Sequence, residues 1–152
     1  TYFIHCFKAQ LILYNHVVRH LRKRKSMNEK ELILKKGEQP VAKISDKDLE
    51  FLIQRDFANN AELIKQKLNK IQSDSRIGKN RISAAVLKIA NSDLTKIDFL
   101  IRKANEDFRD IVSEAEYPRV SKHGFGKRNE KELRTDYLND WTEYTEWKNK
   151  EN

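Results

Sequence analysis

Apolar residues recur at steps of three and four through almost the whole stretch from residue 45 to residue 117. This spacing places them on one face of a helix and indicates amphipathic helices rather than strands. Polar side chains that can cap helices interrupt the pattern near 57–60, 73–80, 91–92 and 104–105. The pattern therefore predicts four helices with very short links, which force neighbouring helices to pack as angled or antiparallel pairs.

The interruptions also predict where single helices begin and end. Ser45 is expected to cap the first helix, with two aspartates in the turn that follows it. Gly78 is expected to complete a turn, and Ser92 and Asn105 are expected to cap the two helices after it. Pro118 is expected to stop the last of them.

The inward faces of these helices should form one core, because their apolar residues follow the helical period. We expect the following side chains to be mostly buried: Ile82, Val86, Ile89, Leu94, Ile97, Ile101, Phe108 and Ile111.

Residues 118–128 are basic and contain two glycines, which predicts a loop, and another helix should begin near Asn129. This helix carries an aromatic stripe at steps of four, three and three. The stripe consists of Tyr137, Trp141, Tyr144 and Trp147. The first interpretation is that the stripe packs the helix onto the body, and the alternative is that it binds a partner, because aromatic residues dominate binding hot spots. The predicted fold is all-α: a small bundle of short angled helices with a C-terminal aromatic amphipathic helix.

The first segment, residues 1–26, differs from the rest of the chain. It is apolar and aromatic up to Val18 and then turns strongly basic. The only methionine is Met27, which leaves two interpretations open. Residues 1–26 are either an extension upstream of a natural start at Met27, or a processed or truncated N-terminal helix.

The remaining chain is expected to hold one domain. Residues 27–44 lack clear periodicity and predict a linker, with a short extended piece at 32–34, and residues 45–152 predict a single helical domain. No apolar run is long enough to predict a transmembrane helix. The lone Cys6 cannot form an internal disulfide, which favours a reducing, cytoplasmic location.

The formal net charge of +8 is distributed very unevenly. Residues 1–26 contain six basic residues and no acid, whereas residues 27–152 hold 25 Lys and Arg against 23 Asp and Glu. The near balance of the second part argues against a body dedicated to nucleic acid. Binding of nucleic acid or an anionic surface is therefore the secondary function, through the basic segment and the 122–128 loop. The residues expected to carry it are Arg19, Arg22, Lys23, Arg24, Lys25, Lys127 and Arg128.

Three carboxylates, Asp107, Asp110 and Glu114, share one helix face, and paired carboxylates can take part in acid–base or metal chemistry. Asp107 is placed where a helix N-terminus favours negative charge. Arg109 is expected to pair either with one of these carboxylates or with a neighbouring helix, whose carboxylates its planar fork can bridge. We therefore expect these four residues to serve the structure rather than catalysis.

Other motifs predict no chemistry either. His16 and His20 have the spacing of a helical metal pair but lack a third ligand. Residues 124–128 lack the strand and spacing of a phosphate-binding loop. Residues 82–104 lack the turn glycine and base-reading side chains of a DNA-binding helix-turn-helix. We expect no catalytic residue, no metal and no cofactor.

One stretch, at about residues 75–118, resembles an uncharacterised group of small bacterial all-helical proteins with the motif D-[FW]-R-D-[VI]-x-x-x-A-E-Y. The matching residues are Arg81, Asp107, Phe108, Arg109, Asp110, Ile111, Ala115, Glu116 and Tyr117. The resemblance implies a helical fold and assigns no activity. The function expected from the sequence is a non-enzymatic protein-binding domain with an immunity-like or regulatory role.

Overall fold

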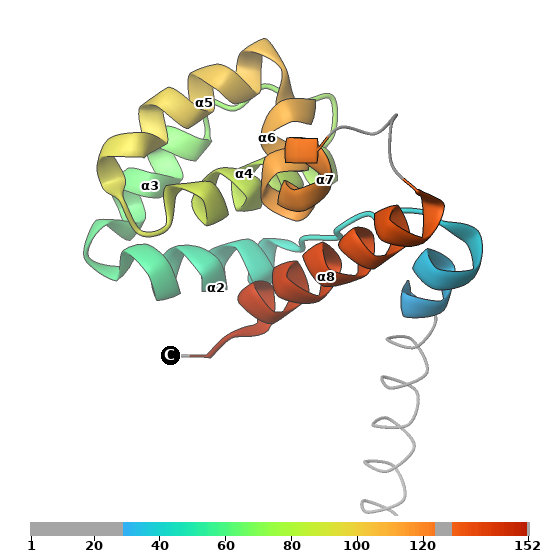
Figure 1. The fold of residues 1–152 in the computed structure, drawn as a ribbon. Helices are drawn as coiled ribbons and strands as arrows, with labels where there is room; N and C mark the ends of the chain where they lie inside the picture. The colour runs from blue at the N-terminus through green and yellow to red at the C-terminus, as the bar shows by residue number, and fades with distance from the viewer. Residues whose placement is uncertain (1–28, 124–128, 152) are drawn as a thin grey trace, which may run out of the picture. The chain divides into compact units, whose positions relative to one another are not determined.

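A computed structural model describes residues 29–123 and 129–151 of the chain. Every regular element in these two ranges is helical, and none is a strand (Figure 1). The prediction of an all-α fold is therefore confirmed. The chain divides into two compact units, Thr1–Pro40 and Val41–Asn152.

In the first unit, the described residues form one short helical segment, the π-helix η1 (Leu32–Lys36). It ends at Gly37, whose φ of 65° is left-handed and whose N–H donates to the carbonyl oxygen of Ile33 at 3.0 Å. An ion pair of Lys35 with Glu31, one helical turn apart, supports the same conformation. The extended piece predicted at 32–34 is therefore wrong, because a glycine stop and a helical charge pair favour a helix end here.

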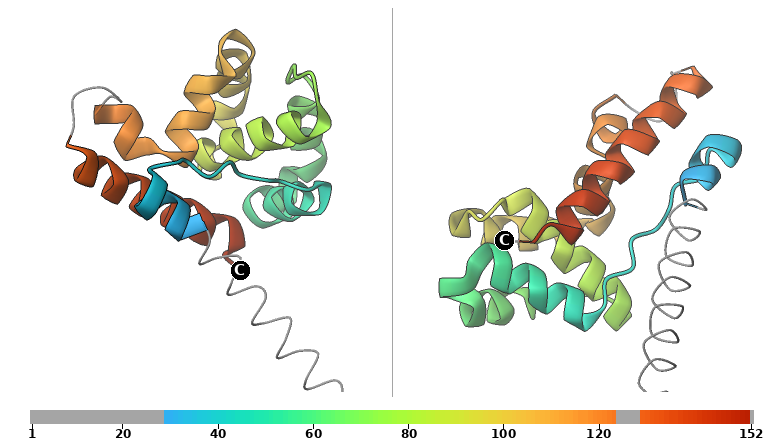
Figure 2. Two further views of the ribbon diagram at one scale, coloured as in Figure 1. Left: turned by 90° about the vertical axis from the view of Figure 1, so that its right-hand side faces the viewer. Right: turned by 90° about the horizontal axis from the view of Figure 1, so that it is seen from below.

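The second unit contains the remaining helices. They are α2 (Asp46–Phe57), α3 (Ala61–Leu68), α4 (Arg76–Ala90), α5 (Ile97–Glu106), α6 (Phe108–Glu116), α7 (Pro118–His123) and α8 (Glu130–Asn149), with 3-10 turns η2 (Ala58–Asn60) and η3 (Leu94–Lys96). Helix α4 lies between α2, α5 and α6 and contacts all three, while α8 lies alongside α7 and α6 (Figures 1 and 2). The predicted breaks separate five helices up to residue 117 rather than four.

The starts of α2 and α4 show how capping side chains set the helix boundaries. Ser45 caps α2 as predicted, because its hydroxyl accepts the N–H of Asp48 at 3.1 Å while the Asp48 carboxylate accepts the N–H of Ser45 at 2.8 Å. Ser75 caps α4, so Gly78 lies inside the first turn of that helix and not in a separate turn. A Cβ at Gly78 would lie 2.8 Å from the hydroxyl oxygen of Ser73 and 2.9 Å from that of Ser75, which explains why glycine fits beside this cap.

The link between α4 and α5 also differs from the prediction. Asn91 and Ser92 both adopt left-handed backbone angles, with φ of 51° and 63°. Asp93, not Ser92, provides the cap, since its carboxylate accepts the N–H of Thr95 at 3.0 Å. Ser92 has left-handed backbone, which the Ncap position of a helix does not use.

Asp107 caps α6 in place of the predicted Asn105. The Asp107 carboxylate accepts the N–H of Arg109 at 2.9 Å. Asn105 instead links the end of α5 to the turn after α3: its amide donates to the carbonyl oxygen of Lys70 at 3.1 Å and accepts the N–H of Gln72 at 2.9 Å. Contacts over such a long sequence separation cannot be inferred from local capping rules.

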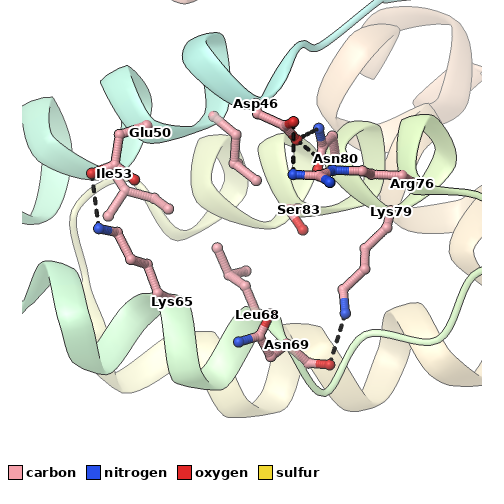
Figure 3. Close-up of a pocket in the computed structure, with 11 residues that line it drawn as sticks. Asp46, Glu50, Ile53, Lys65, Leu68, Asn69, Arg76, Lys79, Asn80 and Ser83 are labelled. Atoms are coloured by element: carbon pink, nitrogen blue, oxygen red, sulfur yellow. Dashed lines mark hydrogen bonds and ion pairs between the residues drawn. The ribbon is translucent and has the colours of Figure 1, made fainter.

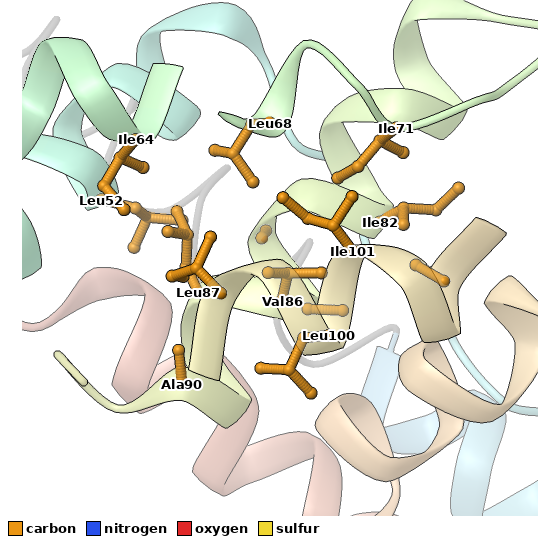
Figure 4. Close-up of a cluster of buried hydrophobic side chains, with 14 of the residues drawn as sticks. Leu52, Ile64, Leu68, Ile71, Ile82, Val86, Leu87, Ala90, Leu100 and Ile101 are labelled. Atoms are coloured by element: carbon orange, nitrogen blue, oxygen red, sulfur yellow. The ribbon is translucent and has the colours of Figure 1, made fainter. Parts of the chain in front are cut away.

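Most of the residues that were expected in the core are buried there (Figure 4). Buried as predicted are Ile82, Val86, Ile97, Ile101 and Ile111, while Ile89 and Leu94 are partly buried against the same cluster. Phe108 contradicts the prediction, because its side chain is 49% exposed. It lies in the first turn of α6 and lines an open pocket, so periodicity identified its face but not whether another element covers that end.

The predicted loop at 118–128 is partly helical. Pro118 is the first residue of α7 and does more than stop α6, as its fixed φ and missing N–H suit a helix start. Asn129 caps α8 as predicted, since its side chain accepts the N–H of Lys131 at 2.9 Å.

Candidate functional site

The aromatic stripe of α8 packs against the end of α6. Tyr137, Trp141 and Tyr144 are buried, and Trp147 is partly buried against the core cluster. The ring of Tyr117 lies 6.2 Å from that of Trp141 in a stacked arrangement, and the stack continues to Tyr144 at 5.9 Å. The stripe therefore contributes to the interior, where its stacked rings hold α8 in place.

A buried ion pair joins α4 to α6 close to this stack. The guanidinium of Arg81 donates two hydrogen bonds of 2.7 Å to the two carboxylate oxygens of Glu116, which is fully buried. The hydrogen bond to Glu116 raises the pKa of Arg81. Two turns later on α4, Lys88 donates to the carbonyl oxygen of Ala115 at 2.6 Å, and burial lowers the pKa of this lysine.

A second buried carboxylate joins α7 to α8. Asp140 accepts the backbone N–H groups of Arg119 at 3.0 Å and Val120 at 3.3 Å. The Arg119 guanidinium also donates to Asp140 at 2.7 Å and binds Glu143, and hydrogen bonds to Glu143 and then Asp140 raise the pKa of Arg119. Asp140 therefore satisfies the first turn of α7 from a neighbouring helix.

Neither Glu116 nor Asp140 is expected from the sequence to be a site residue, although the pattern contains a signal that each acid is buried. Glu116 follows Val112 by four positions and Asp140 follows Tyr137 by three, so each acid lies on the inward face of its helix. An acid on an apolar face indicates a buried partner, because an unpaired buried charge is very costly.

A polar cleft of about 370 Å³ lies between α2, α3 and α4 (Figure 3). Its cations are engaged by neighbouring groups: Lys65 pairs with Glu50 at 2.9 Å, and Arg76 pairs with Asp46 at 2.7 Å. Lys79 donates to the carbonyl oxygen of Asn69 at 2.8 Å. These interactions cross from helix to helix, so the cleft holds the three helices together.

A larger groove of about 740 Å³ lies between α5 and α6. Ile89, Leu100 and Ile111 give it an apolar lining, and Phe99 adds a ring that is 51% exposed. The groove residues of each helix have helical spacing, so each helix presents one continuous face to the groove. The residues on α5 and its ends are Lys96, Phe99, Leu100, Lys103 and Glu106, and those on α6 and its cap are Asp107, Asp110, Ile111 and Glu114.

The two edges of the groove differ in charge. On the α5 edge, Lys96 pairs with Asp93 at 3.7 Å and Lys103 pairs with Glu106 at 3.3 Å. On the α6 edge, Asp110 and Glu114 are exposed and form no ion pair or hydrogen bond with any residue that the structure describes. The unpaired charge of the groove is therefore negative.

Of the two alternatives for Arg109, the structure shows pairing with one of the three carboxylates and, within the part of the chain that it describes, not with an adjacent helix. Arg109 turns back to Asp107, with bonds of 2.9 and 2.6 Å to the two carboxylate oxygens. The hydrogen bonds from the Arg109 side chain, and to a smaller extent the bond from its backbone N–H, lower the pKa of Asp107 to about 2.

The structure shows no further gathering of reactive groups in residues 29–123 and 129–151. Within these ranges no three His, Cys, Asp or Glu side chains are arranged to hold a metal ion. No helix there has the length and apolar character that crossing a membrane requires. Several residues discussed in the sequence lie outside the described residues. They are the expected anion-binding residues Arg19, Arg22, Lys23, Arg24, Lys25, Lys127 and Arg128, and also Cys6, His16 and His20, at which no metal site is expected.

No protein-family model matches this chain, and no curated protein and no solved structure matches it.

Proposed function

We propose that this chain is a protein-binding domain and that the groove between α5 and α6 receives the partner. The observation that carries the proposal is the groove itself: about 740 Å³, an apolar lining, and the half-exposed ring of Phe99. An exposed aromatic ring beside an apolar recess is the arrangement from which binding hot spots are built.

The shape of the groove favours a peptide segment over a small molecule. Two helices line it with residues at steps of three, four and seven, as in domains that receive an amphipathic helix. Charged side chains follow both edges, which matches the polar rim that surrounds the apolar centre of protein interfaces.

An immunity-like or regulatory role is consistent with this mode of action. A domain of this kind acts by occupying a surface of its partner, and it needs no chemistry of its own. We propose the α5–α6 groove as the partner site in place of the aromatic stripe of α8, because three of the four stripe residues are buried.

Site-specific photo-cross-linking tests the proposal. The full chain carries benzoylphenylalanine at position 99 in one preparation and at position 108 in another, since Phe99 and Phe108 are the same residue type with similar exposure. We expect position 99 to form an adduct with one protein, which mass spectrometry identifies. That protein should bind the purified chain and should fail to bind the Phe99→Ser variant. An adduct of equal yield from position 108, or undiminished binding to Phe99→Ser, would remove the groove as the site.

Binding of nucleic acid or an anionic surface is the second candidate. It rests on the sequence, in which residues 1–26 hold six basic residues and no acid. We expect replacement of Arg22, Lys23, Arg24 and Lys25 by glutamine in the full chain to abolish most non-specific DNA binding. A salt titration of DNA affinity measures this, and an unchanged, steep salt dependence would assign the binding to other residues.

A further inference from the structure

We infer that the segment bound in the α5–α6 groove is an amphipathic helix whose polar side carries Lys or Arg beside α6. This inference rests on the proposed function and adds the chemistry of the partner. Its basis is the juxtaposition of an apolar groove with an edge on which Asp110 and Glu114 form no ion pair or hydrogen bond with the residues that the structure describes.

The α6 edge supplies the charge argument. Asp110 and Glu114 are one helical turn apart, exposed, and unpaired within the described residues. The lysines of the opposite edge, Lys96 and Lys103, are already engaged by Asp93 and Glu106. A ligand in the groove therefore meets two acids without an ion pair among the described residues on one side, and on the other two lysines that each already have an acidic neighbour. Opposite charge on the ligand gains most where these acids become partly desolvated.

The dimensions of the groove fit a short helix. Its α5 edge extends from Lys96 to Glu106, about 15 Å at the rise of an α-helix. A ligand helix of similar length places apolar side chains at i, i+3, i+4 and i+7 over Ile89, Leu100 and Ile111. The same helix places basic residues one turn apart, in register with Asp110 and Glu114.

The whole chain carries a net positive charge, which is the same sign as the charge of the inferred ligand. A net charge of +8 attracts acidic ligands at long range. Preference for a basic peptide at physiological salt must therefore come from local contacts, since screening removes the long-range field within about 8 Å.

The test uses fluorescence anisotropy on the full chain with three labelled synthetic peptides. One alternates leucine and lysine at helical spacing, the second replaces each lysine by glutamate, and the third is a scrambled leucine–lysine sequence. We expect only the first peptide to bind tightly. Phe99→Ser and the double variant Asp110→Lys with Glu114→Lys should each weaken it about tenfold or more, which is the effect of losing a central ring or of reversing two rim charges.

Two matched controls separate these effects from general ones. Phe108→Ser removes a ring of similar exposure outside the groove. The double variant Glu132→Lys with Glu151→Lys adds the same positive charge at exposed acids away from it. Both controls should bind the leucine–lysine peptide as the unmodified chain does, and circular dichroism should show unchanged helix content in all variants.

The outcomes distinguish failure of the inference from failure of the proposed function. Tighter binding of the leucine–glutamate peptide, lost in Phe99→Ser, would overturn the basic partner and keep the groove as a binding site. Insensitivity of every peptide to Phe99→Ser would overturn both. Light scattering that shows a dimer dissociated by Phe99→Ser would assign the groove to a second copy of this chain, which also overturns the inference.

Discussion

Helix α6 carries acids on two of its faces, one facing the interior and the other facing solvent. Glu116 is fully buried and accepts both of its hydrogen bonds from Arg81 on α4. Asp110 and Glu114 are exposed along the α5–α6 groove and form no ion pair or hydrogen bond with the described residues. One acid serves the fold, and the other two are available to a ligand.

The difference follows from the cost of desolvation. A charge inside the protein is tolerated only when a well-placed partner satisfies it, so Glu116 and Arg81 must occur together. A charge in water has no such requirement and contributes little to stability. In this chain such charges border an apolar recess with an exposed ring, and the proposed interface rests on that combination.

The same contrast separates the aromatic residues. Trp141 of α8 is buried and stacks on Tyr117 and Tyr144, whereas Phe99 and Phe108 each expose about half of their surface. The ring of Trp141 on α8 is therefore covered by other residues of the chain, whereas the rings of Phe99 on α5 and Phe108 on α6 are only half covered. The following experiments measure how much the covered and the exposed groups differ in their contribution to stability.

The largest effect is expected from breaking the buried ion pair. Arg81→Met leaves Glu116 as a buried charge without its partner, and should lower the free energy of unfolding by about 3–5 kcal/mol. Urea denaturation measures the loss. Replacing both residues, Arg81→Met with Glu116→Leu, should restore much of it, because no charge is then left in the interior. A double variant as unstable as the single one would show that the pair itself holds α4 and α6 together.

A smaller loss is expected from Asp140→Ala. This change removes the acceptor of the N–H groups of Arg119 and Val120, and should cost about 1–3 kcal/mol in unfolding free energy. Glu143→Ala serves as the matched control, since Glu143 is exposed and binds only the outer part of Arg119. Equal costs for the two variants would place the contribution in the surface ion pair instead.

Removal of the exposed rings should scarcely affect stability. Phe99→Ala and Phe108→Ala should each change the unfolding free energy by less than about 1 kcal/mol, because both rings already contact water. Trp141→Ala, at a buried ring, should cost about 3–5 kcal/mol, and urea denaturation measures all three variants. A loss of that size at Phe108 would restore the original expectation that this ring belongs to the core.

The smallest effect concerns the exposed cap of α6. Hydrogen bonds from Arg109 lower the pKa of Asp107 from its usual 3.8 to about 2. A carboxyl group with a depressed folded-state pKa contributes stability above its usual pKa, and this contribution disappears as the pH falls through about 2. Carboxyl NMR titration should give a pKa near 2 for Asp107, and Arg109→Gln should raise it. A value near 3.8 in the unmodified chain would contradict the cap.

The sequence alone determined that this protein is helical, roughly where most helices break, and which apolar stripes become the core. Ile82, Val86, Ile97, Ile101 and Ile111 are buried as expected, because the helical period already states which side chains share a face. The Ser45 cap was equally accessible, since it needs only residues within one turn.

Only the tertiary structure decided which helix faces are covered. Phe108 continues an apolar stripe and is nevertheless exposed, while Glu116 is an acid and is fully buried. Asn105 is used by the turn after α3 and not by its own helix. Periodicity describes one helix at a time, whereas burial, ion pairing and the α5–α6 groove depend on which other helix, distant in sequence, packs against each face.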